Sequence, residues 1–333
     1  MSTGVPRVSI VMAVYNGVAY IDVALGSLQR QTLPDLEIIV VDDGSTDDTV
    51  AAVRRRAADD ARIRLITRPN AGRPSIPRND GLDLTRGKFI GFLDHDDFSH
   101  PERLAVMVAA LEENPRWVAA FHDLDLVNAA GTSLGRTLLQ TSGFRQRAAE
   151  LLLPRVAPLF ELAPGFASFA SLYTAGMHTQ SVLLARERLD FDALRFDPRF
   201  SICDDTDMWM RVAVSGTVGF VDSVLGSYRQ HEGSLMTRRR AFLEDTISLH
   251  VHNYARMTSR FDAATLARYR ERIGGHYATL GWHHLNALEP GLARAPLREA
   301  VRWCPTAEHR RMLFRSYLPK TGQRLLRMLR RGS

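Results

Sequence analysis

Three short apolar runs in the first hundred residues limit the fold of this chain more than any other feature. They occupy residues 8–14 (VSIVMAV), 36–41 (LEIIVV) and 88–93 (KFIGFL), and the first two are rich in β-branched residues. Polar and apolar positions do not alternate along them, which is typical of strands that are covered on both faces of a sheet. The sequence therefore predicts three buried strands.

The segments between these runs have a different period. Residues 20–31 and 47–58 carry apolar side chains at helical spacing, and residues 63–66 form a further short apolar run. Strands that alternate with helices predict an α/β fold with a mostly parallel sheet, flanked by helices and connected by right-handed crossovers. From about residue 235 onward helical spacing continues with few strand signals, so we expect a C-terminal helical appendage there.

Each of the three expected strands is followed by a polar cluster. The clusters are residues 15–17 (YNG), 42–45 (DDGS) and 94–97 (DHDD). Ligands of open parallel sheets bind beyond the carboxyl ends of the strands. All three clusters should open onto that one edge, so a binding site is expected there.

The DHDD cluster allows two interpretations. Adjacent carboxylates repel one another and are costly to bury, so one interpretation is a solvated turn that leads into a helix capped by Ser99. The other is a divalent cation, because Mg²⁺ and Mn²⁺ prefer carboxylate oxygens as ligands. A D-x-D pair on its own does not decide between the two.

Other polar clusters also have a structural and a functional interpretation. Residues 204–207 (DDTD) either begin a helix, where the macrodipole stabilises negative charge, or supply a general base. One of Asp42 and Asp43 is enough for a capping turn, which leaves the other for a ligand. His231 is either an ordinary surface histidine or part of a site.

Cysteine content and hydropathy indicate the compartment. The 333 residues include two cysteines, Cys203 and Cys304, without C-x-x-C spacing, so a reducing compartment fits. The N-terminus lacks the pattern of a signal peptide, and no run of about 18 uncharged apolar residues is present. The most apolar stretch, 162–177, is interrupted by Pro164 and Gly165 and is expected to be a loop. A cytoplasmic location is therefore expected.

Positive charge is concentrated at the C-terminus. Residues 306–333 carry eight Lys or Arg side chains and one Glu, whereas the rest of the chain is close to neutral. Leu325, Met328 and Leu329 can share one face of a helix that arginines flank. This pattern predicts either peripheral contact with an anionic membrane surface or a structural helix that packs on its neighbours.

Six segments resemble one known family. VSIVMAVYNG, IIVVDDGSTDDTV, NAGRPSIPRNDGL, GKFIGFLDHDDF, DDTDMWMR and YRQHEGS stand in the order found in family 2 glycosyltransferases, which have the Rossmann-like GT-A fold. The resemblance covers about residues 7–235 and does not extend into the C-terminal helices. It implies an enzyme that uses a nucleotide-sugar donor.

The resemblance places the nucleotide-sugar site in the N-terminal half. Ala13, Val14 and Tyr15 occupy the segment that lines the nucleoside, with Ala13 in contact through its backbone. Asp43 corresponds to the aspartate that contacts the nucleotide base. Arg73 stands at the basic position near the donor.

The resemblance also implies a metal site and a base. Asp94, His95 and Asp96 match the D-x-D motif that binds the nucleotide sugar, with Asp96 as a ligand of the Mn²⁺ or Mg²⁺ bound to the donor diphosphate. His231 matches a histidine that completes the metal site. Asp205 matches the catalytic base of inverting members.

Two positions depart from the family pattern. Asp204 replaces the usual glutamate before the base, and Pro77 replaces a small residue, which leaves the role of Arg78 open. The Q-x-x-R-W motif of processive synthases is absent, since residues 299–303 read EAVRW. A non-processive enzyme is therefore expected.

These inferences predict a glycosyltransferase domain at 1–235, with a nucleotide-sugar half at about 1–100 and an acceptor half at about 101–235, and a helical region with a basic tail at 236–333. The expected reaction is the inverting, metal-dependent transfer of a sugar from a UDP-sugar to a saccharide or lipid-linked saccharide in surface polysaccharide synthesis.

Two alternative functions stay open. A sugar nucleotidyltransferase would need a Gly-rich basic loop after the first strand. A nucleic-acid-binding protein is disfavoured by the nearly neutral charge of the chain before residue 306.

Overall fold

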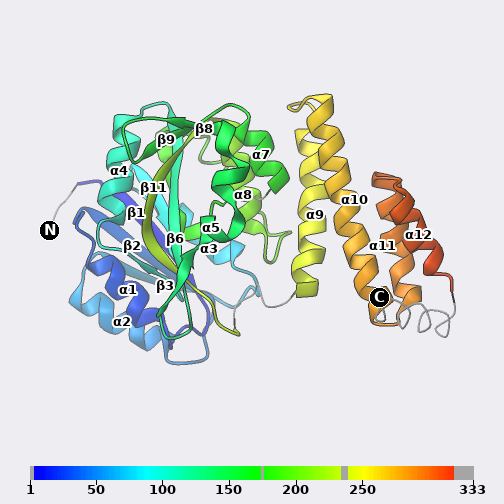
Figure 1. Cartoon of the computed structure of the whole chain (residues 1–333). Coiled ribbons are helices and arrows are strands. Elements are labelled where there is room, and N and C mark those ends of the chain that lie inside the picture. The colour runs from blue at the N-terminus through cyan, green and yellow to red at the C-terminus, as the bar shows by residue number, and fades with distance from the viewer. Residues whose placement is uncertain (1–3, 174–175, 234–238, 319–333) are drawn as a thin grey trace. The chain divides into compact units, whose positions relative to one another are not determined.

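A computed structural model describes residues 4–173, 176–233 and 239–318, and Figure 1 shows its helices and strands. The chain divides into two compact units, Met1–Ser234 and Leu235–Ser333. The first unit combines strands and helices, and the described part of the second is helical.

The described strands of the first unit form one mixed sheet. They are β1 Val8–Val14, β2 Leu36–Asp42, β3 Ile63–Thr67, β4 Phe89–Phe92, β5 Phe98–Ser99, β6 Trp117–Val127, β7 Ser133–Thr137, β8 Leu152–Pro154, β9 Leu159–Leu162, β10 Val182–Ala185 and β11 Thr217–Arg229. Their spatial order is β3-β2-β1-β4-β10-β6-β11-β9-β8, with β5 paired to β11 and β7 paired to β6.

The core of this sheet is mostly parallel, as the sequence predicted. β3, β2, β1 and β4 pair in parallel, and β6 pairs in parallel with β11. β10 lies between the two parallel groups and is antiparallel to both β4 and β6. The α/β fold class is thereby confirmed.

Helices cover both faces of the sheet. The helices of the first unit are α1 Ile21–Gln29, α2 Thr49–Asp59, α3 Ser75–Asp83, α4 Arg103–Glu113, α5 Leu138–Ser142, α6 Phe144–Arg147, α7 Phe166–Tyr173 and α8 Asp204–Ser215. Val8, Ile10 and Met12 of β1 pack in one apolar core with side chains of α1, α2 and α4, whereas Val11 packs in a second core with side chains of α3 and α8. Burial of alternate residues on opposite faces explains the continuous apolar run of β1.

Residues 162–177 were expected to be a loop, and this expectation is wrong, because they contain the helix α7. Phe166, Phe169 and Ala170 have the i, i+3, i+4 spacing of one helix face, and all three are buried in the second core. Pro164 and Gly165 stand before the helix and do not interrupt it.

The second unit contains four described helices, α9 Arg239–Met257, α10 Ala263–Asn286, α11 Pro290–Trp303 and α12 Ala307–Arg315. α10 and α11 approach closely, because a Cβ atom on Gly281 would lie 2.4 Å from Cγ of Leu297. None of the helices in the part of the chain that the structure describes is long and apolar enough to cross a membrane. The expected basic helix at 323–329 lies outside the described residues.

Candidate active site

The loops that follow β1 and β2 are hydrogen-bonded to each other at the carboxyl edge of the sheet. Asn16, which follows β1, has a positive φ of 50°, and its side-chain oxygen accepts a hydrogen bond from the backbone N–H of Thr46 at 2.8 Å. Of the three residues predicted to line a nucleoside, Tyr15 is 46% exposed, Ala13 is partly exposed and Val14 is buried. A ligand at this edge would meet the Tyr15 side chain first.

Asp43 lies at the same edge and faces the segment that follows β3. Its two carboxylate oxygens accept hydrogen bonds from the backbone N–H of Ala71 at 3.0 and 3.1 Å, and Arg68 forms an ion pair with it. Arg73, from the same segment, donates to the carbonyl of Pro198. Asp43 is 4% exposed, so in this structure it orders residues 68–71 and presents little surface to solvent.

The D-x-D loop, residues 93–97 between β4 and β5, forms a tight turn next to the end of β1. The backbone N–H of Asp97 donates to the carbonyl of Asp94 at 3.1 Å. His95 packs so closely on Gly17 that a Cβ atom there would lie 2.5 Å from Cδ2 of His95. This close approach requires glycine at position 17.

Asp96 and His231 lie in contact, although 135 positions separate them in the sequence. Nε2 of His231 is 2.9 Å from Oδ2 of Asp96, and the two side chains are 15% and 20% exposed, respectively. Arg229, at the end of β11, donates from Nε to the carbonyl of Asp96 at 2.7 Å and from its backbone N–H to Oδ1 of Asp97 at 2.8 Å. These two bonds fasten the end of β11 to the D-x-D loop.

Arg78 of α3 links the D-x-D loop to α8. Its guanidinium donates to Oδ1 of Asp94 at 2.7 Å and to Oδ2 of Asp204 at 2.9 Å, and the Arg78 side chain is nearly buried. Burial alone would raise the pKa of Asp94, but Arg78 and then His178 outweigh it and lower that pKa below its ordinary value. For Asp204, burial outweighs Arg78 and raises the pKa to about 7.

Asp205 lies in the first turn of α8. Its Oδ2 accepts a hydrogen bond from the hydroxyl of Thr179 at 3.0 Å, and its Oδ1 accepts one from the backbone N–H of Thr206 at 2.6 Å. Its neighbours Asp204 and Asp207 are 1% and 0% exposed, whereas Asp205 is partly exposed. Of the three acids in this turn, Asp205 is therefore the one that a ligand can reach.

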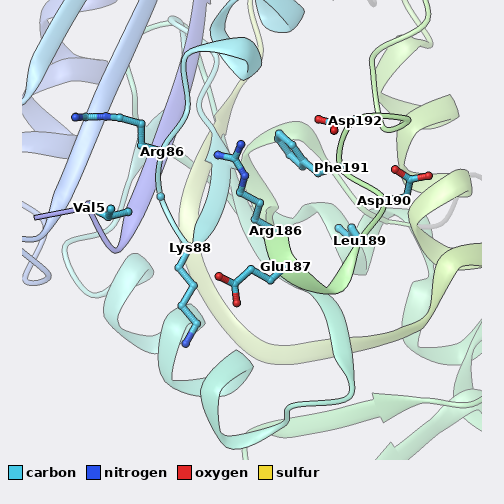
Figure 2. A pocket seen from close by; sticks show the side chains of 10 residues that line it. Val5, Arg86, Lys88, Arg186, Glu187, Leu189, Asp190, Phe191 and Asp192 are labelled. Atoms are coloured by element: carbon cyan, nitrogen blue, oxygen red, sulfur yellow. The ribbon is translucent and has the colours of Figure 1, made fainter.

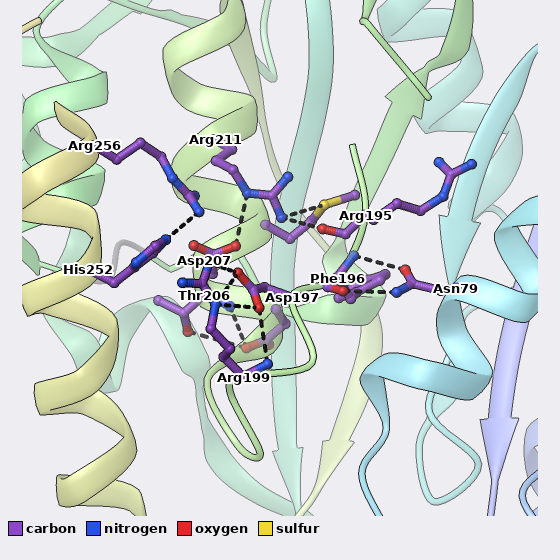
Figure 3. Close-up of polar contacts among 12 residues, drawn as sticks. Asn79, Arg195, Phe196, Asp197, Arg199, Thr206, Asp207, Arg211, His252 and Arg256 are labelled. Atoms are coloured by element: carbon purple, nitrogen blue, oxygen red, sulfur yellow. Dashed lines mark hydrogen bonds and ion pairs between the residues drawn. The ribbon is translucent and has the colours of Figure 1, made fainter. Parts of the chain in front are cut away.

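Asp207 has a structural partner on its own helix. Its Oδ2 accepts a hydrogen bond from Nε of Arg211 at 2.9 Å, and Arg211 also donates to the carbonyl of Arg195 (Figure 3). In the same view, Asn79 of α3 exchanges two hydrogen bonds with the backbone of Phe196, at 2.8 and 2.9 Å. These contacts hold the segment that leads into α8.

Two site residues, His178 and Thr179, carried no signal in the sequence. They stand before β10 in the stretch MHTQ, which contains no recognisable motif spacing. One ligand atom each of His178, Asp94 and Asp97 lie within 4.8 Å of one another. The insertion of β10 between β4 and β6 places them there, and this strand order is not readable from local sequence.

A pocket of about 510 Å³ lies at the opposite edge of the sheet. Figure 2 shows Arg86 and Lys88, which precede β4, and Arg186 and Phe191, which follow β10, among its walls. Because β10 is antiparallel to β4, the start of β4 and the end of β10 share this edge. None of the described residues that line it belongs to the predicted site, which lies at the carboxyl ends of the parallel strands.

Sequence comparison agrees with this architecture. Residues 9–144 match the family model for glycosyl transferase family 2. The GalNAc(5)-diNAcBac-PP-undecaprenol beta-1,3-glucosyltransferase of Campylobacter jejuni is 40% identical over 93 residues, which are 28% of this chain and 30% of the relative. The chain likewise matches only 28% to 44% of the length of three further relatives, glycosyltransferases by name, from Bacillus subtilis and Haemophilus influenzae.

Solved structures share the fold at 18% sequence identity. The crystal structure of S. aureus TarS 1–349 in complex with UDP-GlcNAc has a TM-score of 0.59, and the match covers 89% of each chain. The mannosyltransferase PcManGT from Pyrobaculum calidifontis, in complex with GDP-Man and Mn²⁺, has a TM-score of 0.55 over 94% of this chain and 85% of that one. Residues 9–144 therefore form a glycosyltransferase family 2 domain, and the chain shares the GT-A fold of these solved structures.

Proposed function

We propose that this protein is an inverting, metal-dependent, non-processive glycosyltransferase that moves one sugar from a UDP-sugar to a saccharide or lipid-linked saccharide. The observation that carries this proposal is the bridge that Arg78 makes from Asp94 to Asp204. The bridge holds the D-x-D loop against the first turn of α8, which supports a role in donor binding for the one and in acceptor activation for the other.

The donor nucleotide would bind over the ends of β1 and β2. The exposed ring of Tyr15 offers a stacking surface, and Ala13 and Val14 precede it in the segment that would line the nucleoside. Asp43 would receive a hydrogen bond from the base, and Arg73 would approach the phosphates. Both require new partners on donor binding, since Asp43 now accepts from the 68–71 segment and Arg73 donates to a carbonyl.

Asp96 and His231 would hold the divalent cation. A carboxylate oxygen and an imidazole nitrogen suit Mn²⁺, and the pair is partly exposed, so phosphate oxygens of a donor can reach it. His95 would support this loop through its packing on Gly17. A bound cation would neutralise the negative charge that develops on the departing diphosphate.

Asp205 would act as the general base. Its carboxylate takes the proton of the acceptor hydroxyl while that oxygen bonds to the anomeric carbon and the bond from this carbon to the diphosphate breaks. Attack on the face opposite the leaving group inverts the configuration and needs no covalent enzyme intermediate. The hydrogen bond from Thr179 keeps the carboxylate oriented for this step.

The named relatives support the proposed substrate class. The similar C. jejuni enzyme is named for a substrate that carries PP-undecaprenol, and the two similar structures hold UDP-GlcNAc, or GDP-Man with Mn²⁺. We therefore place the reaction in surface polysaccharide synthesis, in the cytoplasm at the inner face of the membrane. The peripheral membrane contact would come from the basic C-terminal tail.

A donor panel tests this proposal. Thermal stabilisation and hydrolysis would be measured with UDP-GlcNAc, UDP-glucose and GDP-mannose, each with MnCl₂, with MgCl₂ and with EDTA. We expect a UDP-sugar to stabilise the protein, EDTA to abolish the effect and MnCl₂ to restore it. The Asp96→Ala variant should lose the effect, whereas the exposed Asp59→Ala variant of α2 should retain it. Full UDP affinity of Asp96→Ala with and without EDTA would contradict the metal assignment.

A further inference from the structure

The region around the D-x-D loop is rich in negative charge. Among the described residues its carboxylates are Asp94, Asp96, Asp97, Asp204 and Asp205. Two guanidinium groups, those of Arg78 and Arg229, lie among them. The region therefore holds more carboxyl groups than guanidinium groups that could compensate them.

Asp97 is the carboxylate with the least compensation. It is 1% exposed, and its Oδ1 accepts the hydrogen bond from the backbone N–H of Arg229. Its Oδ2 has no hydrogen-bond partner among the residues that the structure describes. A buried oxygen of this kind is costly unless a proton or a cation satisfies it.

The imidazole of His178 lies close to Asp94 and Asp97. Its Nδ1 has no hydrogen-bond partner in the described part of the chain, and its ring packs against Tyr228 with the centroids 4.5 Å apart. Ligand atoms of His178, Asp94 and Asp97 lie within 4.8 Å of one another. Nitrogen and oxygen ligands lie about 2.1 Å from a bound divalent metal, so two ligands of one ion can be about 4 Å apart. A shift of less than about 1 Å would bring the three groups onto one ion.

We propose that Asp94, Asp97 and His178 form a second divalent-cation site, separate from the proposed site at Asp96 and His231. Two carboxylates and one imidazole favour Mn²⁺ over Ca²⁺, which takes oxygen ligands. Arg78 donates a hydrogen bond to Oδ1 of Asp94. In the described structure no hydrogen bond joins Arg78 to Asp97 or His178. The site needs neither donor nor acceptor, so it goes beyond the proposed function.

Binding of MnCl₂ alone to the full chain tests the proposal, with free Mn²⁺ counted by electron paramagnetic resonance. Wild type should bind two Mn²⁺ per chain, and His178→Gln should bind one. The double variant Asp96→Ala/His231→Ala should also bind one. Addition of His178→Gln to that double variant should remove the remaining ion.

Two further variants make the result decisive. Asp97→Asn keeps the shape of the side chain and should also bind one Mn²⁺. This variant tests the site even if His178→Gln does not fold. Circular dichroism would show whether each variant is folded. His283→Gln, at an exposed histidine of α10, should bind two. Wild-type binding by folded His178→Gln or Asp97→Asn would overturn the proposal and leave a proton on Asp97 as the compensation. The double variant lacks the proposed ligands Asp96 and His231, so the ion that it retains tests this second site separately from the proposed function.

Discussion

Asp205 and Asp204 are neighbours with different surroundings. The groups that donate to Asp205 are the Thr179 hydroxyl and the N–H and hydroxyl of Thr206, and all three are neutral. Asp204 is instead buried against the charged Arg78. Neutral donors orient the Asp205 carboxylate for a ligand that can reach it, whereas the hydrogen bond from Arg78 commits the buried Asp204 to a structural partner.

The Asp205→Asn variant should separate catalysis from binding. Asparagine keeps the shape of the side chain but does not accept a proton, so transfer should fall by roughly 10²–10⁴-fold while UDP binding is unchanged. Steady-state kinetics and a UDP titration would measure the two effects. The exposed Asp59→Asn variant is the matched control and should behave as wild type. Turnover close to wild type in Asp205→Asn would place the base elsewhere.

Asp204 should make stability depend on pH. Its pKa of about 7 in the folded protein is above the value of about 3.9 for an unperturbed aspartate, so the folded state holds this proton more tightly. The stability that this proton contributes is complete below about pH 4 and is lost as the pH rises through about 7. The free energy of unfolding of wild type should therefore fall relative to that of Asp204→Asn between pH 4 and pH 7. Urea denaturation of both proteins would measure this, and parallel pH curves would contradict it.

At the scale of elements, the bounds of strands β1 to β4 could be predicted closely from the sequence. β1 has the predicted bounds, β2 and β3 each extend one residue further, and β4 is one residue shorter at each end. Continuous apolar runs of this length fit the interior of a parallel sheet and little else. Their local pattern is therefore sufficient to predict these strands.

Elements whose place depends on distant partners could not be predicted in this way. β10 is a four-residue apolar strand, VLLA, whose local pattern fits a strand or a buried helix equally well. Its antiparallel pairing with β4 and β6 is decided by contacts far apart in the sequence. His178 and Thr179 precede it, so their place in the site was hidden for the same reason.

The site itself was predictable in part. The acidic clusters at 94–97 and 204–207 are visible in the sequence, because several carboxylates stand together. The bridge that Arg78 makes could not be predicted, because nothing in the local pattern RNDGL indicates that this arginine has two acidic partners on other elements. Charge clusters can be read along the chain, but the counter-charge that satisfies them comes from another element.

At the scale of the whole molecule, the basic C-terminal segment should bind an anionic surface. Residues 319–333, which lie outside the described structure, carry five Lys or Arg side chains. Each basic residue near an anionic membrane contributes on the order of 1 kcal/mol, and salt screens this attraction. The full-length protein should co-sediment with phosphatidylglycerol liposomes at low salt, less at high salt, and little with phosphatidylcholine liposomes. A version that ends at Leu318 should lose the binding, and equal binding by the two proteins would contradict the prediction.

β10 also joins the two parallel groups of strands in the first unit. Leu183 and Leu184 pair with β4 on one side and with β6 on the other. In the described structure, these pairs and the short contact of β5 with β11 are the hydrogen-bonded ladders that join the β1–β4 group to β6 and β11. The backbone of β10 lies within these ladders, so the exchange of its amides with solvent deuterium reports the free energy that holds the β1–β4 group to β6 and β11.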